Sequence, residues 1–140
     1  MWKATCRSPV DSDQGNAMIG YKPGCDVGEL EPWPFDNPAS RYVITSGLPQ
    51  ASGRLDAGGP GFQTRFGIWR CTVGVFECIE QGDELMTVLS GRCRLINHTE
   101  GREVLLGPSD SLFIRDRSHV TWDISEDLTK VFHGYKADGY

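Results

Sequence analysis

The sequence predicts an all-β protein built as a single antiparallel sandwich or barrel. Short runs rich in β-branched and aromatic residues recur about every ten residues from Arg41 onward. The segments between these runs supply the Gly, Asn, Asp and Ser that tight turns require. No stretch shows the apolar periodicity of an amphipathic helix. With 140 residues, the chain has the size of one domain.

The elements follow in order along the chain. Residues 1–40 are predicted to form an irregular N-terminal arm, because Pro and Gly interrupt regular structure throughout its second half. Trp33 and Phe35 are expected to pin this arm to the body. Residues 41–140 are predicted to form the β-barrel domain, with residues 46–64 as a long Gly-rich loop. The expected strands are 41–45, 66–73, 75–81, 84–91, 92–98, 102–108, 111–116, 120–125 and 129–135. A helical turn is expected only at residues 125–128.

The composition and charge of the chain argue against some classes of binding partner. A net charge of −5, with Lys and Arg scattered, argues against nucleic acid as a partner. No apolar run approaches the roughly 20 residues of a membrane span, and the N-terminal residues lack the apolar core of a secretory signal. We therefore expect a cytoplasmic protein that binds neither nucleic acid nor membrane. The five cysteines contain no CxxC pair, which argues against a zinc knuckle or a redox motif.

Several motifs resemble those of the cupin superfamily of small jelly-roll barrels. Glu84 and Gly91 have the spacing of the acid and the last glycine in the first cupin motif, and Pro108-Ser109-Asp110 matches the turn of the second. The segments 67–74 (GIWRCTVG) and 121–124 (TWDI) are similar to the small ureidoglycine aminohydrolase-like cupins. The resemblance covers roughly residues 41–135. It implies a cupin-type antiparallel jelly-roll β-barrel.

The same resemblance locates a candidate site. The three positions that usually carry the cupin histidines hold Cys78, Glu80 and Val120 in this chain. A thiolate and two carboxylates, from Cys78, Glu80 and Glu84, could hold a divalent ion such as Zn, Mn or Fe. Since no imidazole remains in this set, a metal is one alternative, and no cofactor is required.

Alternation along the strands leads to a second interpretation of the same residues. Cys78 and Glu80 share one face of their strand, and the resemblance turns this face inward together with Glu84. Two neighbouring carboxylates raise the pKa of one of them, which suits proton transfer. We therefore predict Glu84 and Glu80 as catalytic residues, assisted by Cys78. The predicted substrate-binding residues are Tyr42, Trp69, Phe76, Met86, Val120 and Trp122.

A structural interpretation stays open beside this one. The carboxylates could instead be satisfied by Arg70, Arg94 or backbone amides, since buried carboxylates are costly unless paired. On the last strand, Lys130 and His133 have opposite parity, so at most one of them faces inward.

The leading hypothesis is a homodimeric cupin that binds a small organic molecule. It would transform this molecule by acid/base chemistry: isomerisation, cyclisation, elimination or hydrolysis. The alternatives are a non-catalytic binding or sensing module and a divalent-metal-dependent enzyme.

Overall fold

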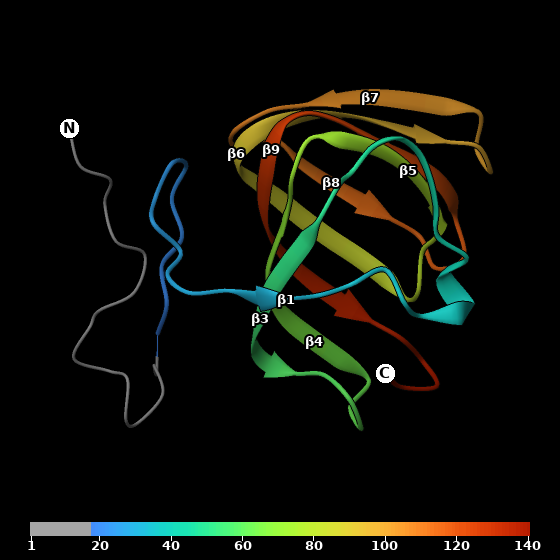
Figure 1. Ribbon diagram of the computed structural model, residues 1–140. Coiled ribbons are helices and arrows are strands. Elements are labelled where there is room, and N and C mark those ends of the chain that lie inside the picture. The colour runs from blue at the N-terminus through green and yellow to red at the C-terminus, as the bar shows by residue number, and fades with distance from the viewer. Residues whose placement is uncertain (1–17) are drawn as a thin grey trace.

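A computed structural model describes residues 18–140, which fold into nine strands and one short 3-10 helix. The strands are β1 (Glu31–Pro32), β2 (Val43–Gly47), β3 (Ala51–Gly58), β4 (Thr64–Cys71), β5 (Gly74–Ile79), β6 (Asp83–Asn97), β7 (Arg102–Leu106), β8 (Ser111–Ile114) and β9 (His119–Tyr135). The helix is η2 (Pro38–Ser40). Figure 1 shows the strands rolled into a barrel, which confirms the predicted all-β jelly roll.

Two long strands, β6 and β9, hold the barrel together. They pair with each other along almost their entire lengths. The first half of β6 and the second half of β9 belong to one layer, in the order β1-β3-β4-β9-β6-β8. The remaining halves belong to the other layer, in the order β2-β5-β9-β6-β7. Both strands therefore run through both layers and turn the corner between them.

This corner lies at positions where turns of the chain were predicted from the sequence. The β6–β9 register shifts at Ser90 and Arg92, on both sides of Gly91. Gly91 has a φ of +87° and its Cα faces the backbone of Asp127 closely. The predicted breaks near residues 91 and 126 are therefore bulges within continuous strands, which bend without ending. The helical turn expected at residues 125–128 is wrong, because these residues belong to β9.

The expected loop at residues 46–64 is also corrected, because residues 51–58 form β3. This strand pairs with β4 from Ala51↔Cys71 to Gly58↔Arg65. Gly53 and Arg54 interrupt the alternation of apolar and polar residues by which a strand is recognised in a sequence. At Gly53, a Cβ would lie 2.4 Å from the ring of Trp33. The glycine therefore provides room for an aromatic side chain of the arm.

The described part of the arm packs on the barrel from two directions. Trp33 lies 6.2 Å from Phe132, and Phe35 lies 4.5 Å from Phe76, between ring centroids. These contacts confirm the predicted role of the two aromatic residues as clamps. A second apolar cluster, which includes Val27, covers the outer face of the first layer. Residues 1–17 of the predicted arm lie outside the described residues, and its boundary at residue 40 stays a prediction.

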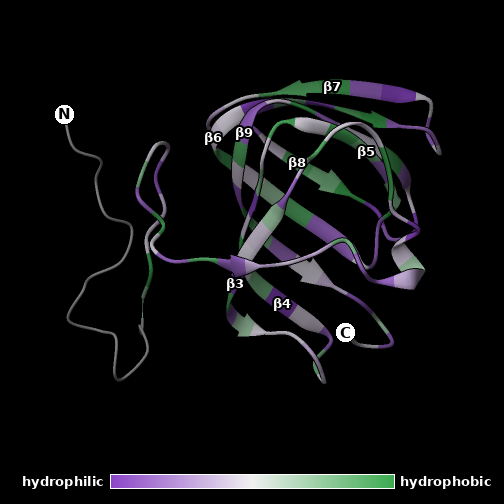
Figure 2. Cartoon of the chain, viewed as in Figure 1, coloured by the Kyte–Doolittle hydropathy of each residue, from purple (hydrophilic) through white to green (hydrophobic). Residues whose placement is uncertain are grey.

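The core fills the barrel below its open end. Its most buried large side chains include Phe76, Met86, Ile114 and Leu128. Figure 2 shows hydrophobic and hydrophilic residues alternating along parts of the strands, and in β5 every second residue is buried. The interior is therefore formed by one side of each strand.

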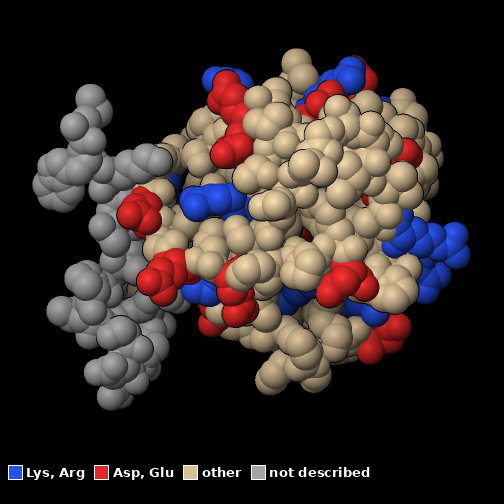
Figure 3. Space-filling model, in the orientation of Figure 1, with Lys and Arg blue, Asp and Glu red and all other residues tan. Residues whose placement is uncertain are grey.

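The visible surface carries acidic and basic side chains interspersed with a broad uncharged area (Figure 3). Among residues 18–140, no helix is long and apolar enough to cross a membrane.

We predict that Gly91→Ala destabilises the fold more than Gly101→Ala does. Both glycines have positive φ, +87° and +67°, so each substitution incurs a conformational cost of about 1 kcal/mol or more. Only at Gly91 would the new Cβ also meet backbone, 2.1 Å from the carbonyl oxygen of Asp127, whereas the space at Gly101 is open. Urea denaturation should show a loss of roughly 3 kcal/mol or more for Gly91→Ala. Equal losses in the two variants would contradict the close packing at the corner.

Candidate functional site

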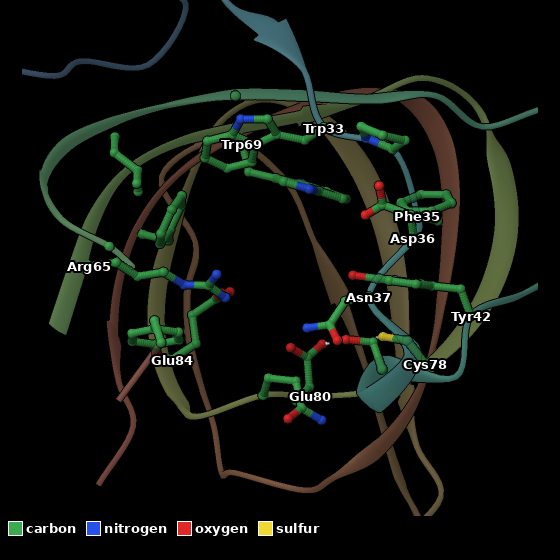
Figure 4. Close-up of a pocket in the computed structure, with 18 of the residues that line it drawn as sticks. Trp33, Phe35, Asp36, Asn37, Tyr42, Arg65, Trp69, Cys78, Glu80 and Glu84 are labelled. Atoms are coloured by element: carbon green, nitrogen blue, oxygen red, sulfur yellow. Dashed lines mark hydrogen bonds between the residues drawn. The ribbon is translucent and has the colours of Figure 1, made fainter. Parts of the chain in front are cut away.

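A cavity of about 1070 Å³ opens between the two layers of the barrel. Figure 4 shows side chains from both layers and from the arm surrounding it. Both aromatic and charged groups form its wall, including Trp33, Phe35, Tyr42, Arg65, Trp69, Cys78, Glu80, Glu84, Trp122 and Lys130.

A buried ion pair lies at the wall of this cavity. Lys130 of β9 donates to Glu84 of β6, with 2.5 Å between Nζ and Oε2. Only 4% of Lys130 and 9% of Glu84 are exposed to solvent. Two groups this buried are stable as ions only because each neutralises the other.

Two indole rings complete the surroundings of the ammonium group. Nζ of Lys130 lies 4.4 Å from the ring centroid of Trp122 and 4.8 Å from that of Trp69. The two rings lie 5.6 Å apart at a tilt of 46°. An ammonium this close to aromatic rings gains cation–π stabilisation, which increases when water is excluded. The lysine is thus held by one carboxylate and two tryptophans.

Glu80 is the second acid of the cavity, and its partners are neutral. Its Oε1 accepts hydrogen bonds from Nε1 of Trp122 at 3.1 Å and from Sγ of Cys78 at 3.8 Å. Burial raises the pKa of Glu80, and the negative charge of Glu84 raises it further, while Lys130 partly opposes this shift. The cavity therefore contains one carboxylate with a dedicated cation and one that is driven towards its protonated form.

Two groups near Glu80, the Cys78 thiol and the Tyr42 phenol, also have raised pKa values. Burial raises the pKa of the Cys78 thiol far above its ordinary value, and Glu80 adds to the shift. Burial also raises the pKa of Tyr42 to about 12. At neutral pH, the thiol and the phenol therefore act as neutral donors.

Arg65 of β4 provides a second cation. Its guanidinium carbon lies 4.2 Å from the ring centroid of Tyr140 and 5.7 Å from that of Phe132. Figure 4 shows the guanidinium directed towards the middle of the cavity. Within residues 18–140, the buried Nε of Arg65 makes no hydrogen bond. The guanidinium group of Arg65 thus forms part of the wall around the space that a ligand would fill.

Comparison with known families decides the class of this barrel. The EutQ-like cupin domain matches residues 58–132, which is more than half of the 140 residues. The chain belongs to the EutQ-like cupin family. A comparison with proteins of curated function finds no match.

Solved structures share the fold of this EutQ-like cupin. The EutQ protein of Clostridium difficile has a TM-score of 0.53 and 18% identity, over 64% of this chain and 71% of that one. A protein of unknown function from Pseudomonas syringae has a TM-score of 0.59 and 22% identity, over 76% of this chain and 44% of that one. A Rhizobium leguminosarum protein of unknown function has a TM-score of 0.52 and 19% identity, over 61% and 81%. At these identities, the likeness concerns the fold.

The EutQ-like cupin brings most of the predicted site residues to one cavity. Seven of them line it: Tyr42, Trp69, Phe76, Cys78, Glu80, Glu84 and Trp122. Met86 and Val120 face inward as predicted, but they lie in the core and do not line the cavity. The alternation placed them on the correct side of the sheet, but it carries no information on their depth along the barrel.

Cys78, Glu80 and Glu84, which the sequence predicted as possible metal ligands, are not arranged as a metal site. Among the described residues, the donor atoms of Cys78, Glu80 and Glu84 do not gather within 4.8 Å of one another. Glu84 instead binds the ammonium group of Lys130, so a cation of the protein itself already neutralises this carboxylate. We therefore derive no chemistry through a metal at this position.

The partners of the two acids differ from those considered in the sequence. Arg70 donates to Thr129 at 2.9 Å, and Arg94 pairs with Asp123 at 3.3 Å. Neither therefore neutralises the cavity carboxylates. Lys130 neutralises Glu84. His133 has the opposite parity on the same strand, so it lies on the outside of the barrel, where it stacks on Phe66.

Sequence reasoning missed Arg65 as a residue of the site. Its signal is the parity that it shares with Trp69 on β4, since residues four apart on a strand face the same side. The contributions of Trp33 and Phe35 to the wall had no such signal, because the arm is irregular.

We predict strong coupling between Lys130 and Glu84 in the stability of the fold. Lys130→Met or Glu84→Gln alone leaves one buried charge unpaired, which should lower the free energy of unfolding by about 3–5 kcal/mol. The double variant removes both charges and should lose much less than the sum of the two. Urea denaturation of the four proteins measures this coupling.

The matched control is the exposed pair between Arg92 and Glu126, 3.9 Å apart with 63% of each side chain exposed. Its coupling should not exceed about 1 kcal/mol. Additive losses at Lys130 and Glu84 would show that the two groups do not depend on each other.

We also predict that Glu80 makes the fold less stable as the pH rises. A carboxyl whose pKa is raised in the folded state keeps its proton there while the unfolded chain loses it. Stability should therefore fall as the pH rises from the ordinary pKa of 4.5 to the raised native value, and then level off. Glu80→Gln should remove this component of the slope. Parallel pH profiles of the unfolding free energy for both proteins would contradict the prediction.

Proposed function

We propose that this cupin binds a small organic acid in the barrel cavity and transfers a proton to or from it through Glu80. The observation that carries the proposal is that the two carboxylates have different partners. Glu84 is bound to Lys130, while Glu80 has a raised pKa and accepts hydrogen bonds from two neutral donors, Trp122 and Cys78. A buried carboxyl with a raised pKa, next to a carboxylate that is paired with a cation, is typical of acid/base sites.

The wall of the cavity supports an anionic ligand with an apolar or planar body. Arg65 offers a guanidinium that can bind a carboxylate through two parallel hydrogen bonds. Trp33 and Trp69 offer flat apolar surfaces near the mouth (Figure 4). A small carboxylic acid combines both features.

The chemistry then follows from the positions of the charges. Ionised Glu80 takes a proton from a carbon next to the carbonyl or carboxyl group of the ligand, and the electrons of that C–H bond move onto the carbonyl oxygen. The positive charge of Arg65 stabilises the negative charge that develops on this oxygen. Return of the proton to another carbon gives isomerisation, and loss of a leaving group gives elimination.

A raised pKa suits this role. A carboxylate with a raised pKa accepts a proton more readily than an ordinary carboxylate does. Its two hydrogen bonds from described residues end on Oε1, which leaves Oε2 for the ligand.

The broader expectations form part of the same proposal. Homodimer formation and the narrower likeness to ureidoglycine aminohydrolase-like cupins are consistent with it, but the proton-transfer step depends on neither. A non-catalytic binding module is the second candidate, because Arg65 and the indoles would bind an acid equally well without turnover.

The test uses a library of small carboxylic acids screened by ligand-observed NMR in D₂O. We expect the wild-type protein to bind at least one of them and to exchange deuterium into its acidic C–H position. Glu80→Gln should retain binding and lose exchange by about a hundredfold or more. Arg65→Gln should weaken binding and should also slow exchange at saturating ligand, because its charge stabilises the developing anion.

The outcomes separate the candidates. Binding without exchange in the wild-type protein would reject catalysis and leave a binding module. No binding of any acid, or equal binding by Arg65→Gln, would reject the assignment of an anionic ligand. Exchange that persists in Glu80→Gln would place the base elsewhere.

A further inference from the structure

A second cluster of ionisable side chains lies on the opposite surface of the barrel wall. Glu77 of β5, His98 after β6 and His119 at the start of β9 lie next to one another there. The pairing register explains why: His119 lies opposite Ile79, and Glu77 lies opposite Thr121. Alternation directs these side chains outward, while Cys78 and Trp122 point into the barrel.

The donor atoms of this cluster are close enough to share one ion. Nε2 of His119 lies 2.9 Å from Oε1 of Glu77, and Nε2 of His98 lies 4.0 Å from the same oxygen. Each of the three residues offers a ligand atom within 4.8 Å of the others, and no other group of residues 18–140 does so. Ligands of a tetrahedral zinc ion lie roughly 3.3 Å apart, because each is about 2 Å from the metal. Small rotations of exposed side chains close this difference.

The backbone holds the two histidines in place before any ion arrives. The N–H of His98 donates to the carbonyl oxygen of His119 at 2.8 Å. The N–H of His119 donates to Oγ1 of Thr99 at 2.9 Å. The two imidazole rings lie 4.6 Å apart, between centroids. A rigid frame of this kind reduces the entropy lost when ligands gather around a metal.

We infer that Glu77, His98 and His119 form a binding site for a divalent transition-metal ion of the zinc class. Two imidazoles and one carboxylate suit Zn²⁺ and its neighbours, whereas Mg²⁺ and Ca²⁺ require oxygen ligands. Three protein ligands leave a fourth coordination position open to water or to a ligand. Between 34% and 45% of each side chain is exposed, so an ion can reach the site from solvent. The site is independent of the barrel cavity and of the function proposed for it.

The competing explanation is a hydrogen-bonded surface cluster without affinity for metal. In the structure, Nε2 of His119 is hydrogen-bonded to Oε1 of Glu77 at 2.9 Å, and Nε2 of His98 is hydrogen-bonded to Oγ1 of Thr121 at 2.7 Å. An ion would replace both contacts.

The experiment titrates Zn²⁺ into untagged, metal-stripped protein in competition with a chromophoric chelator. We expect saturable binding of about one ion per chain, because the described residues hold a single such group. His98→Gln and His119→Gln should each weaken binding by at least about tenfold. His133→Gln is the matched control, since this exposed histidine stacks on Phe66 elsewhere and should leave binding unchanged. Thermal melts of each apo protein verify that the variants fold.

The absorption spectrum of the Co²⁺-loaded protein identifies the ligands. Nitrogen and oxygen ligands give weak visible bands without a thiolate charge-transfer band, and Cys78→Ser should leave the spectrum unchanged. Absence of saturable binding, or binding that survives the double replacement of His98 and His119, would overturn the inference. A thiolate band that disappears in Cys78→Ser would likewise overturn it by locating the ion in the barrel.

Discussion

The cavity depends on the ion pair between Lys130 and Glu84. An ammonium and a carboxylate that are almost fully buried must neutralise each other, and two indole rings hold the ammonium in position. This pair determines the chemistry of the remaining acid. Glu80, beside the ion-paired Glu84, is driven towards its neutral form. Within residues 18–140, the donor atoms of Cys78, Glu80 and Glu84 do not gather as the ligands of a metal would. This difference between the two acids is the basis of the proton transfer that we propose.

The long strands β6 and β9 make this arrangement possible. Glu84 and Lys130 are 46 residues apart in the sequence, and continuous pairing of β6 with β9 brings them together. The same strands, with β5, present a different chemistry on their other face. Since successive side chains point to opposite sides of a sheet, Cys78 contributes to the cavity while its neighbour Glu77 contributes to the outer histidine cluster. One wall therefore carries two separate groups of ionisable residues.

Which residues share a face of a strand could be predicted from the sequence. Where the strands end, and how deep each residue lies in the barrel, could not. Alternation grouped these residues by face, and the cupin resemblance correctly implied that the face of Cys78, Glu84 and Trp122 is the interior one. Alternation could not show that Met86 and Val120 lie below the cavity, because depth depends on how the barrel is tilted and filled. Polar and glycine residues at the corner are typical of turns, and only the register shows that the strands continue through them. Strand β3 was missed because its glycine accommodates Trp33 from a distant segment.

The sequence by itself determined the all-β class, the inward side of most strands and the convergence of acids with aromatic residues. These properties are local, since turn chemistry and the two-residue period of a strand are set by neighbours along the chain. The partners of those acids were decided only by the tertiary structure. Lys130 meets Glu84, Arg65 reaches the cavity, and two histidines from different elements meet Glu77 on the outside. Such contacts depend on strand register and bending, which long-range pairing sets and no local pattern encodes.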